Sequence, residues 1–414
     1  MNILNVGTYS PQQCGIASFS KDLRDNLIRL GEHISIAAVS DPHYTYQYPN
    51  EVSYVLRQTH KEDYANTADT VNRDYGIDLV IVQHEYGIYG GDDGDYLLDF
   101  TSHLKKPFLL VTHTVLPTPT TGQRTVLRNL CRQAAGIVCM TKSSARLATQ
   151  IYKAEADKVH IIQHGVPAFR QKNRCQLKRE YGFGDKNLIT TFGLIGPGKG
   201  IEIGIRTMKE LVSQHKDLVY LIVGRTHPML VKHEGERYRE MLTDLVIELG
   251  LQDNVNFVNR FLEPEELGDY LYMTDIYLSP YPQADQAVSG TLAYALGCGR
   301  AIVSTPYLYA QEMVAEGQRG LVAPDATPTA LAELLNRILA EPDLKLILEK
   351  RAAKLGGKIK WPYIAQQYAT LAENIFKSEL AAFYSACSQD WEAKWGRNTK
   401  LNEGIGNKFT PYLV

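Results

Sequence analysis

Three short segments of the chain combine glycine with basic or hydroxyl side chains in a way that suits an anion. The first covers residues 192–200, FGLIGPGKG, in which Gly193 and Gly198 let the backbone approach a ligand and Lys199 adds a point charge suited to a phosphate. A helical pattern follows, and a helix amino terminus favours an anion. The spacing matches neither a Walker loop nor a GxGxxG fingerprint. The alternative is a glycine-rich turn with a solvated lysine.

The second segment, GRTHP, places Arg225 just beyond the end of a predicted strand. A guanidinium group in that place can bind phosphate oxygens through two parallel N–H donors. A surface salt bridge explains the arginine equally well. Arg225 is therefore a candidate ligand for an anion, with both interpretations open.

The third segment covers residues 285–291, DQAVSGT, and leads into a predicted helix. Backbone amides and hydroxyl groups at a helix start form an anion pocket, and the candidates are Ser289, Gly290 and Thr291. Asp285 and Gln286, just before them, can accept hydrogen bonds from ligand hydroxyls. A helix cap by Ser289 or Thr291 explains part of the segment without any ligand.

In the first half of the chain, candidate residues again follow predicted strands. Residues 10–17, SPQQCGIA, open a helix, and we interpret Cys14 as a packing residue or a passive backbone donor. His84 with Glu85, and then His113, each follow a buried-looking strand. A lone histidine is more often a satisfied core residue than a catalyst. Two histidines at successive strand ends facing one cleft favour a functional role, above all for His113.

Apolar runs that alternate with helical patterns predict parallel sheets built from βαβ units. In the first half, we predict strands at residues 2–7, 33–39, 79–83, 107–112, 136–140 and 159–163. In the second half, we predict strands at residues 188–192, 219–223, 255–259, 276–278, 301–304 and 320–321. The predicted helices include residues 18–30, 64–74, 125–135, 200–215, 237–249, 264–273, 290–297 and 328–341. Two open α/β sheets in one chain form a cleft, and such sheets bind ligands at the carboxyl ends of their strands.

The pattern therefore runs twice, which predicts an α/β fold of two Rossmann-like domains. We place the first domain at residues 1–168 and the second at 169–362. Further helices are expected at residues 363–376 and 379–388, and residues 398–414 have no strong periodicity, which predicts a flexible tail.

The composition excludes several classes of protein. A net charge of −2 gives no support for a nucleic acid partner. Six scattered cysteines without a CxxC pair, and no clustered histidines, indicate a reducing compartment and neither a disulfide framework nor a zinc site. The acidic loop at residues 90–95 lacks the EF-hand spacing, so we assign no metal. No signal peptide and no membrane span are expected, which predicts a cytoplasmic protein.

One predicted helix carries Arg124, Arg128 and Arg132 at helical spacing. Such a stripe could contact anionic lipid or a lipid-linked acceptor at the inner face of the membrane. A solvated helix face is the favoured interpretation.

The ordered set of segments resembles family 4 of the retaining glycosyltransferases, which have the GT-B fold. The resemblance covers about residues 1–385. It rests on the segment Cys14-Gly15-Ile16, on His113, on the lysine at Lys199, and on the small-residue helix before GCGRAIVSTP. It implies terminal helices that return to the first domain, which holds the acceptor, while the second domain holds a nucleotide-sugar donor.

The resemblance also implies roles in metal-independent hexose transfer that retains the anomeric configuration. Lys199, Arg225 and the amides at residues 289–291 would hold the diphosphate, with His113 orienting the sugar or the acceptor. Gly15, Gly193 and Gly198 would allow close approach to the donor, with backbone at Arg260, Phe261 and Leu262 reading the base and Asp285 or Gln286 holding sugar hydroxyls. The acceptor side would be formed by Cys14, His84 and Glu85.

The chain departs from this family at three positions. Leu194 stands where members carry an arginine, and Gln286 and Tyr294 stand where they carry two glutamates. The segment SGTLAYALGCGRAIVSTPY resembles a bacterial, including cyanobacterial, branch linked to envelope or storage polysaccharides. We expect UDP-glucose as donor, with GDP-mannose second, and a saccharide or lipid-linked acceptor. The alternatives are a GT-B phosphorylase or epimerase, a non-catalytic sugar-nucleotide-binding protein and, as the weakest, a dehydrogenase.

Overall fold

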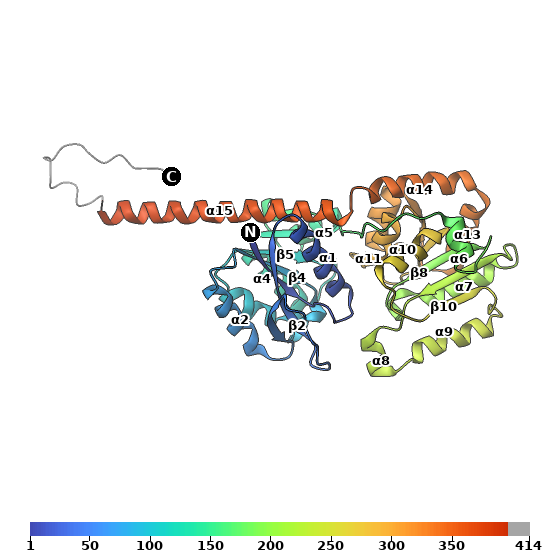
Figure 1. Cartoon of the computed structure of the whole chain (residues 1–414), viewed down its shortest axis with the longest axis horizontal. Helices are drawn as coiled ribbons and strands as arrows, with labels where there is room; N and C mark the ends of the chain where they lie inside the picture. The colour runs from blue at the N-terminus through green and yellow to red at the C-terminus, as the bar shows by residue number, and fades with distance from the viewer. Residues whose placement is uncertain (396–414) are drawn as a thin grey trace.

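The computed structural model describes residues 1–395, with side chains through Ser385. Within this part of the chain, the strands form two parallel sheets, one of seven strands and one of six, each in its own half of the sequence (Figure 1). Their orders are β3-β2-β1-β4-β5-β6-β7 and β10-β9-β8-β11-β12-β13. The predicted α/β architecture of two Rossmann-like domains is confirmed.

The first sheet contains β1 (Asn2–Gly7), β2 (His33–Ser40), β3 (Val52–Arg57), β4 (Leu79–His84), β5 (Phe108–Thr112), β6 (Gly136–Cys139) and β7 (Val159–Ile161). The second contains β8 (Asn187–Phe192), β9 (Leu218–Val223), β10 (Val255–Val258), β11 (Ile276–Ser279), β12 (Ala301–Ser304) and β13 (Gly320–Val322). All the predicted strands are present, but β3 was missed. Only Leu56 is buried in this edge strand, and Ser53 and Arg57 limit its apolar run to three residues.

Helices cover both faces of each sheet, which is why central strands such as β4 and β9 are buried along their whole length. The first domain contains α1 (Gly15–Arg29), α2 (Lys61–Arg73), α3 (Tyr96–His103), α4 (Thr121–Gln133) and α5 (Lys142–Gln150). The second contains α6 (Arg174–Glu180), α7 (Ile201–Leu211), α8 (Pro228–Glu234), α9 (Arg237–Glu248), α10 (Pro264–Met273), α11 (Gly290–Gly297), α12 (Leu308–Ala310), α13 (Pro328–Ala340) and α14 (Pro342–Gly356).

The chain ends its described part in one long helix, α15 (Trp361–Trp395), which lies along the first domain (Figure 1). The prediction of two separate helices at residues 363–376 and 379–388 was wrong, because no proline or glycine interrupts the chain between Pro362 and Trp395. The side chains of Ile364, Tyr368 and Ile375 are buried in the core of the first domain. The expected return of the terminal helical region to that domain is confirmed. The predicted tail at residues 398–414 lies outside the described residues.

Two chain segments pass side by side between the domains. Val166 lies on the segment that leads from the first domain to the second. Its backbone N–H donates to Ile359 O at 2.9 Å, and its carbonyl oxygen accepts the backbone N–H of Trp361 at 3.0 Å. The indole ring of Trp361 is buried and meets the ring of Phe19 edge-on at 5.0 Å between centroids. Because Phe19 belongs to α1, Trp361 fixes both crossings against the first domain.

Polar contacts also join the two domains. Asp22 of α1 accepts hydrogen bonds from Trp361 Nε1 at 3.0 Å and from the Tyr294 hydroxyl of α11 at 3.2 Å. Glu312, from the second domain, accepts the backbone N–H groups of Lys142 and Ser143 at the start of α5, at 2.7 and 2.9 Å. These bonds place side chains of one domain against the helix starts and helix faces of the other.

No helix in the described part of the chain combines the length and the apolar character needed to cross a membrane. The arginine stripe lies on α4, where Arg124, Arg128 and Arg132 are exposed opposite a buried face that contains Leu127 and Leu130.

Replacing Trp361 tests the importance of the crossing. We expect Trp361→Ala to lower the free energy of unfolding by roughly 3–5 kcal/mol, because it empties a packed site and leaves Asp22 without one donor. Trp361→Phe, which keeps an aromatic ring, should cost less. Denaturant unfolding followed by circular dichroism measures both. Tyr363→Ala, at an exposed position on the same helix, is the control. Equal stability of Trp361→Ala and Tyr363→Ala would contradict the assignment.

Asp22 should make stability depend on pH. Burial raises its pKa from 3.8 to about 6, although the hydrogen bonds from Tyr294 and Trp361 oppose this. The folded state therefore binds the proton more tightly, so this contribution is present below the unfolded pKa and is lost as pH rises from about 4 to about 6. Compared with the wild type, Asp22→Asn should flatten the pH dependence of the unfolding free energy over that range. A flat wild-type profile would argue against a protonated Asp22.

Candidate functional site

A cleft of about 510 Å³ lies between the domains and is lined by residues of both. Its walls are formed by loops that follow β1, β4 and β5 on one side and β8, β9 and β11 on the other. In each sheet the strand order reverses beside the first strand, between β1 and β4 and between β8 and β11. Loops diverge at such switch points and leave a crevice. The cleft is therefore where both sheets would bind a ligand.

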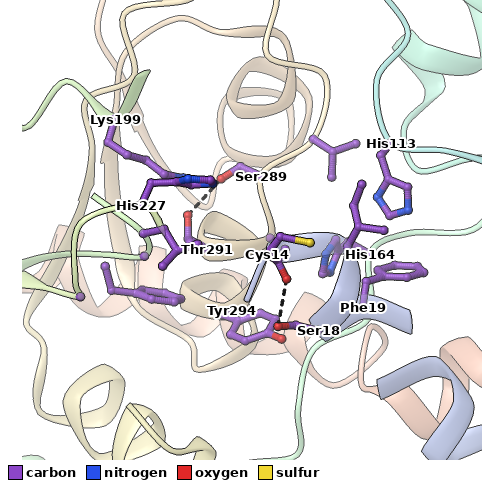
Figure 2. Close-up of a pocket in the computed structure, with 18 of the residues that line it drawn as sticks. Cys14, Ser18, Phe19, His113, His164, Lys199, His227, Ser289, Thr291 and Tyr294 are labelled. Carbon is purple, nitrogen blue, oxygen red and sulfur yellow. Dashed lines mark hydrogen bonds between the residues drawn. The ribbon is translucent and has the colours of Figure 1, made fainter. Parts of the chain in front are cut away.

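Most of the predicted site residues line this cleft, and three do not. The residues brought together are Cys14, Gly15, Glu85, His113, Gly193, Lys199, Arg225, Arg260, Phe261, Leu262, Gln286, Ser289, Gly290 and Thr291. Those left outside the lining are His84, Gly198 and Asp285. In Figure 2, Lys199, His227, Ser289 and Thr291 gather on one side, and Cys14, Phe19, His113 and His164 on the other.

On the first wall, Cys14 serves as a helix cap. Its sulfur accepts the backbone N–H of Ala17 at 3.3 Å and lies 3.1 Å from the Thr8 hydroxyl oxygen. The thiol therefore ends the loop after β1 and starts α1 at Gly15, which leaves open space beside its backbone toward the cleft. This geometry agrees with a packing role for the thiol.

His113 is held in a defined orientation. Its Nε2 lies 2.9 Å from Gln83 Oε1, while Gln83 Nε2 donates to Asn5 Oδ1 at 2.8 Å. Because that Gln83 oxygen can only accept, we assign the proton of the His113 ring to Nε2, which leaves Nδ1 as an acceptor. Burial is the main cause that lowers the pKa of His113 to about 3, and the nearby His164 and His84 lower it further. The ring is therefore neutral at physiological pH and can accept a hydrogen bond from a ligand hydroxyl.

Glu85 contributes a carboxylate to the same wall. It accepts the Thr114 hydroxyl at 2.6 Å and the backbone N–H of Tyr86 at 3.0 Å. Burial raises its pKa even though both hydrogen bonds favour the ionised form. It is the only carboxylate among the described residues that line the cleft.

His84 does not face the cleft, contrary to its expected position at the acceptor. Side chains alternate along β4, so Gln83 points to the face that His113 shares, and His84 points to the opposite one. There the ring of His84 packs edge-on against Tyr86 at 4.8 Å, and burial lowers its pKa to about 4. Its two ring nitrogens have no partner among the described residues. This histidine is a core residue.

On the second wall, the glycine loop forms a short 3-10 turn, η4 (Pro197–Lys199), before α7. Gly200 adopts a left-handed conformation there, and a Cβ atom would lie 2.0 Å from the carbonyl oxygen of Pro280. Lys199 turns into the cleft and donates to the hydroxyl of Tyr281 at 2.6 Å. Gly198 instead lies at the exposed outer side of the turn.

The start of α11 combines a capping bond with groups that face the cleft. Ser289 accepts the backbone N–H of Leu292 at 3.3 Å, so the capping interpretation is right for Ser289. Ser289, Gly290 and Thr291 also line the cleft. Gln286 donates its amide nitrogen to Val288 O at 2.7 Å, which directs the side chain along the loop. Asp285 lies one residue earlier and outside the lining.

Cationic groups gather beside this helix start. Arg225 lines the cleft, and its buried Nε atom has no hydrogen-bond partner in the described structure. His227 accepts the backbone N–H of Met229 through Nδ1 at 3.2 Å, so Nε2 carries the proton of the neutral ring. Burial, and then the charges of Lys199 and Arg225, lower the pKa of His227. Three side chains that can be positive thus face one region.

The outer end of this wall is formed by Arg260, Phe261 and Leu262. The Arg260 guanidinium pairs with Glu266 and is largely exposed. Phe261 is 48% exposed, whereas Leu262 is buried. An exposed aromatic ring at the mouth of a cleft offers a flat apolar surface to a planar ligand.

All three positions at which the sequence departs from the resembled family line the cleft, Gln286 among them. Leu194 gives the second wall an apolar side chain where the resembled family has an arginine. Tyr294 directs its hydroxyl to Asp22 of the other domain. Tyr294, at a position where the resembled family has a glutamate, therefore forms a contact between the two domains.

Sequence reasoning missed Phe19, His164, His227 and Tyr281, all of which line the cleft. His164 follows the last strand of the first domain, His227 lies two residues beyond Arg225, and Tyr281 follows β11. Proximity to a strand end was the available signal for these three. Phe19 lies inside α1, where nothing in the local pattern separates it from an ordinary core residue.

Comparison with known proteins places this fold. Residues 173–355 match the family model described as Glycosyl transferases group 1. The chain is 22% identical to alpha-D-kanosaminyltransferase of Streptomyces kanamyceticus over 55% of its length, and 28% identical to GDP-mannose-dependent alpha-(1-6)-phosphatidylinositol monomannoside mannosyltransferase of Mycolicibacterium smegmatis over 44%. It spans about half the length of these curated relatives, 57% and 44%.

Solved structures extend the likeness to nearly the whole chain. Sucrose-phosphate synthase from Thermosynechococcus elongatus aligns with a TM-score of 0.72 at 19% identity, covering 91% of this chain and 99% of that one. Anabaena Alr3699/HepE in complex with UDP aligns with a TM-score of 0.73 at 15% identity, covering 90% and 100%. HepE has also been solved with UDP-glucose. The chain therefore has the GT-B fold, and the match to the group 1 glycosyl transferase model lies within its second domain.

Proposed function

We propose that this protein is a retaining, metal-independent glycosyltransferase that moves a hexose from a nucleotide diphosphate sugar to a saccharide or lipid-linked acceptor. The observation that carries the proposal is the division of the cleft. One wall presents Lys199, Arg225 and His227 beside a helix start, and the opposite wall presents the neutral acceptor His113 and the carboxylate of Glu85. A diphosphate suits the first wall, and sugar hydroxyls suit the second.

Loss of the nucleotide diphosphate develops negative charge on its oxygens. The Lys199 ammonium, the free Nε of Arg225 and the amides at residues 289–291 would stabilise that charge. Because these groups are already in place, little reorganisation is needed as the bond breaks. Arg225 would supply the positive charge that the resembled family has from an arginine at the position of Leu194.

The sugar would lie between the two walls. His113 would accept a hydroxyl through Nδ1, and Gln286 would offer its carbonyl oxygen from the second domain. Glu85 would orient the acceptor. Closure of the domains would exclude water and limit hydrolysis of the donor.

We propose that the acceptor attacks on the face from which the phosphate departs and that this phosphate takes the acceptor proton. A double displacement through two facing carboxylates needs a second carboxylate beside Glu85, and the lining described here offers none. Side chains would supply the positive charge that a metal ion would otherwise bring. Unchanged transfer in the presence of a chelator is therefore expected.

UDP-glucose is the proposed donor, with GDP-mannose second, and polysaccharide synthesis is the proposed context. The HepE complexes with UDP and UDP-glucose support the first choice, and the mannosyltransferase among the relatives supports the second. A contact of the arginine stripe on α4 with anionic lipid or a lipid-linked acceptor remains part of this proposal.

Titration calorimetry with UDP, GDP, UDP-glucose and GDP-mannose tests the donor class. We expect one nucleotide to bind in the micromolar range and Lys199→Ala to weaken it about tenfold or more, because a charge-assisted hydrogen bond to phosphate is lost. Lys232→Ala, at an exposed lysine of α8, should have no effect.

The outcomes separate the alternatives. Binding without transfer or hydrolysis of any donor would favour a non-catalytic sugar-nucleotide-binding protein. Phosphate-dependent breakdown of a disaccharide would favour a phosphorylase. If no nucleotide binds, the proposed function fails.

His227 should link nucleotide affinity to proton uptake. Its pKa in the free protein is lowered below 6.5, and a bound diphosphate would raise it, so affinity should increase as pH falls through the pKa of the complex and level off below the pKa of the free protein. His227→Asn keeps an acceptor for the Met229 N–H and removes the titration. Calorimetry in buffers of different ionisation enthalpy should show less proton uptake for this variant than for the wild type. The nucleotide's own titration is common to both proteins, so equal uptake would exclude His227 from the diphosphate site.

A further inference from the structure

Tyr281 lies just beyond β11, where its buried side chain lines the donor wall of the cleft. Its hydroxyl meets three polar groups at once. Lys199 Nζ lies at 2.6 Å, Thr291 Oγ1 at 2.7 Å and Ser289 Oγ at 3.3 Å. The phenol therefore joins the loop after β8 to the start of α11.

The donors and acceptors of this group are consistent with one arrangement. Lys199 can only donate, and Ser289 donates, so the phenolic oxygen accepts from both. Its own proton then goes to Thr291 Oγ1. One ammonium hydrogen of Lys199 is used, and two remain for a ligand.

The ring of Tyr281 is itself fixed. It stacks on Tyr307 at 5.1 Å with an angle of 17° between the planes, and Lys199 Nζ lies 4.4 Å from the centre of the Tyr281 ring. Tyr307 points its hydroxyl elsewhere, to Ser279 at 2.6 Å. A flexible lysine side chain is thus tied to a ring that cannot easily move.

Electrostatics agree with this geometry. Burial by itself would raise the pKa of Tyr281, but the Lys199 charge and the hydrogen bonds that the phenol makes with Lys199, Ser289 and Thr291 together outweigh it, so the pKa lies below its usual value. A lowered pKa makes the hydroxyl a stronger donor to Thr291.

We propose that Tyr281 is a positioning residue for donor binding, which holds the Lys199 ammonium and the Thr291 hydroxyl where they meet the diphosphate of the nucleotide sugar. The proposal rests on the proposed function, because it assigns the diphosphate to these groups. Tyr281 acts through Lys199 by removing the need to order a long side chain when the ligand arrives.

A double-mutant cycle tests this role. The variants are Tyr281→Phe, Lys199→Ala and the two combined, with Tyr307→Phe as the control that removes the neighbouring phenol, whose hydroxyl bonds to Ser279. The affinity for UDP is measured by calorimetry, kcat and KM for the donor by steady-state kinetics, and folding by thermal melting.

Tyr281→Phe should weaken UDP binding by about tenfold and raise the donor KM more than it lowers kcat. In the Lys199→Ala background the same substitution should weaken UDP binding clearly less than in the wild type, because the part of its effect that acts through Lys199 is already lost. Tyr307→Phe should bind UDP as the wild type does. If Tyr281→Phe does not fold, Thr291→Val removes the other end of the same bond and should weaken UDP binding in the same manner.

Each failure has a separate signature. Unchanged affinity in Tyr281→Phe, or full additivity with Lys199→Ala, overturns the positioning role while the proposed function stands. Equal losses in Tyr281→Phe and Tyr307→Phe would show a structural effect and also overturn it. Absence of both UDP and GDP binding by the wild-type protein contradicts the proposed function itself.

Discussion

The cleft depends on how the chain crosses twice between its domains. Trp361 packs on α1 at the second crossing and donates to Asp22, which also accepts the Tyr294 hydroxyl from the other domain. A rigid ring at this point sets how the carboxyl ends of the two sheets face each other. The helix that begins at Trp361 then packs on the first domain, where Ile364 and Tyr368 join its core.

The walls of the cleft differ in charge. Burial keeps the histidines of the first domain neutral, as the lowered pKa values of His113 and His164 indicate. The second domain keeps Lys199 and Arg225 among hydroxyl groups and backbone amides. A ligand with an anionic end and a hydroxyl-rich end would fit this division, and a nucleotide diphosphate sugar has both. The apolar Leu194 lies where further charge would be expected from the resemblance.

Much of the fold followed from the sequence, because strands buried on both faces read as apolar runs and the loops after them hold the site. The glycine loop from Phe192 to Lys199 and the hydroxyl-rich start of α11 could therefore be recognised in the sequence as candidate binding segments. The edge strand β3 escaped because only Leu56 in it is buried. The continuity of α15 was also missed. A short polar stretch suggests a break between two helices, but without proline or glycine that stretch stays helical.

The sequence by itself determined which loops would carry chemistry, since strand ends are local features. Only the tertiary structure decided which side chains enter the cleft. His84 and His113 look alike in sequence, yet alternation along the strand sends His84 into the core and leaves His113 beside the ligand space. Tyr281 and Tyr294 acquired their partners, Lys199 and Asp22, from distant segments. Such pairings depend on how the sheets pack, which no local pattern encodes.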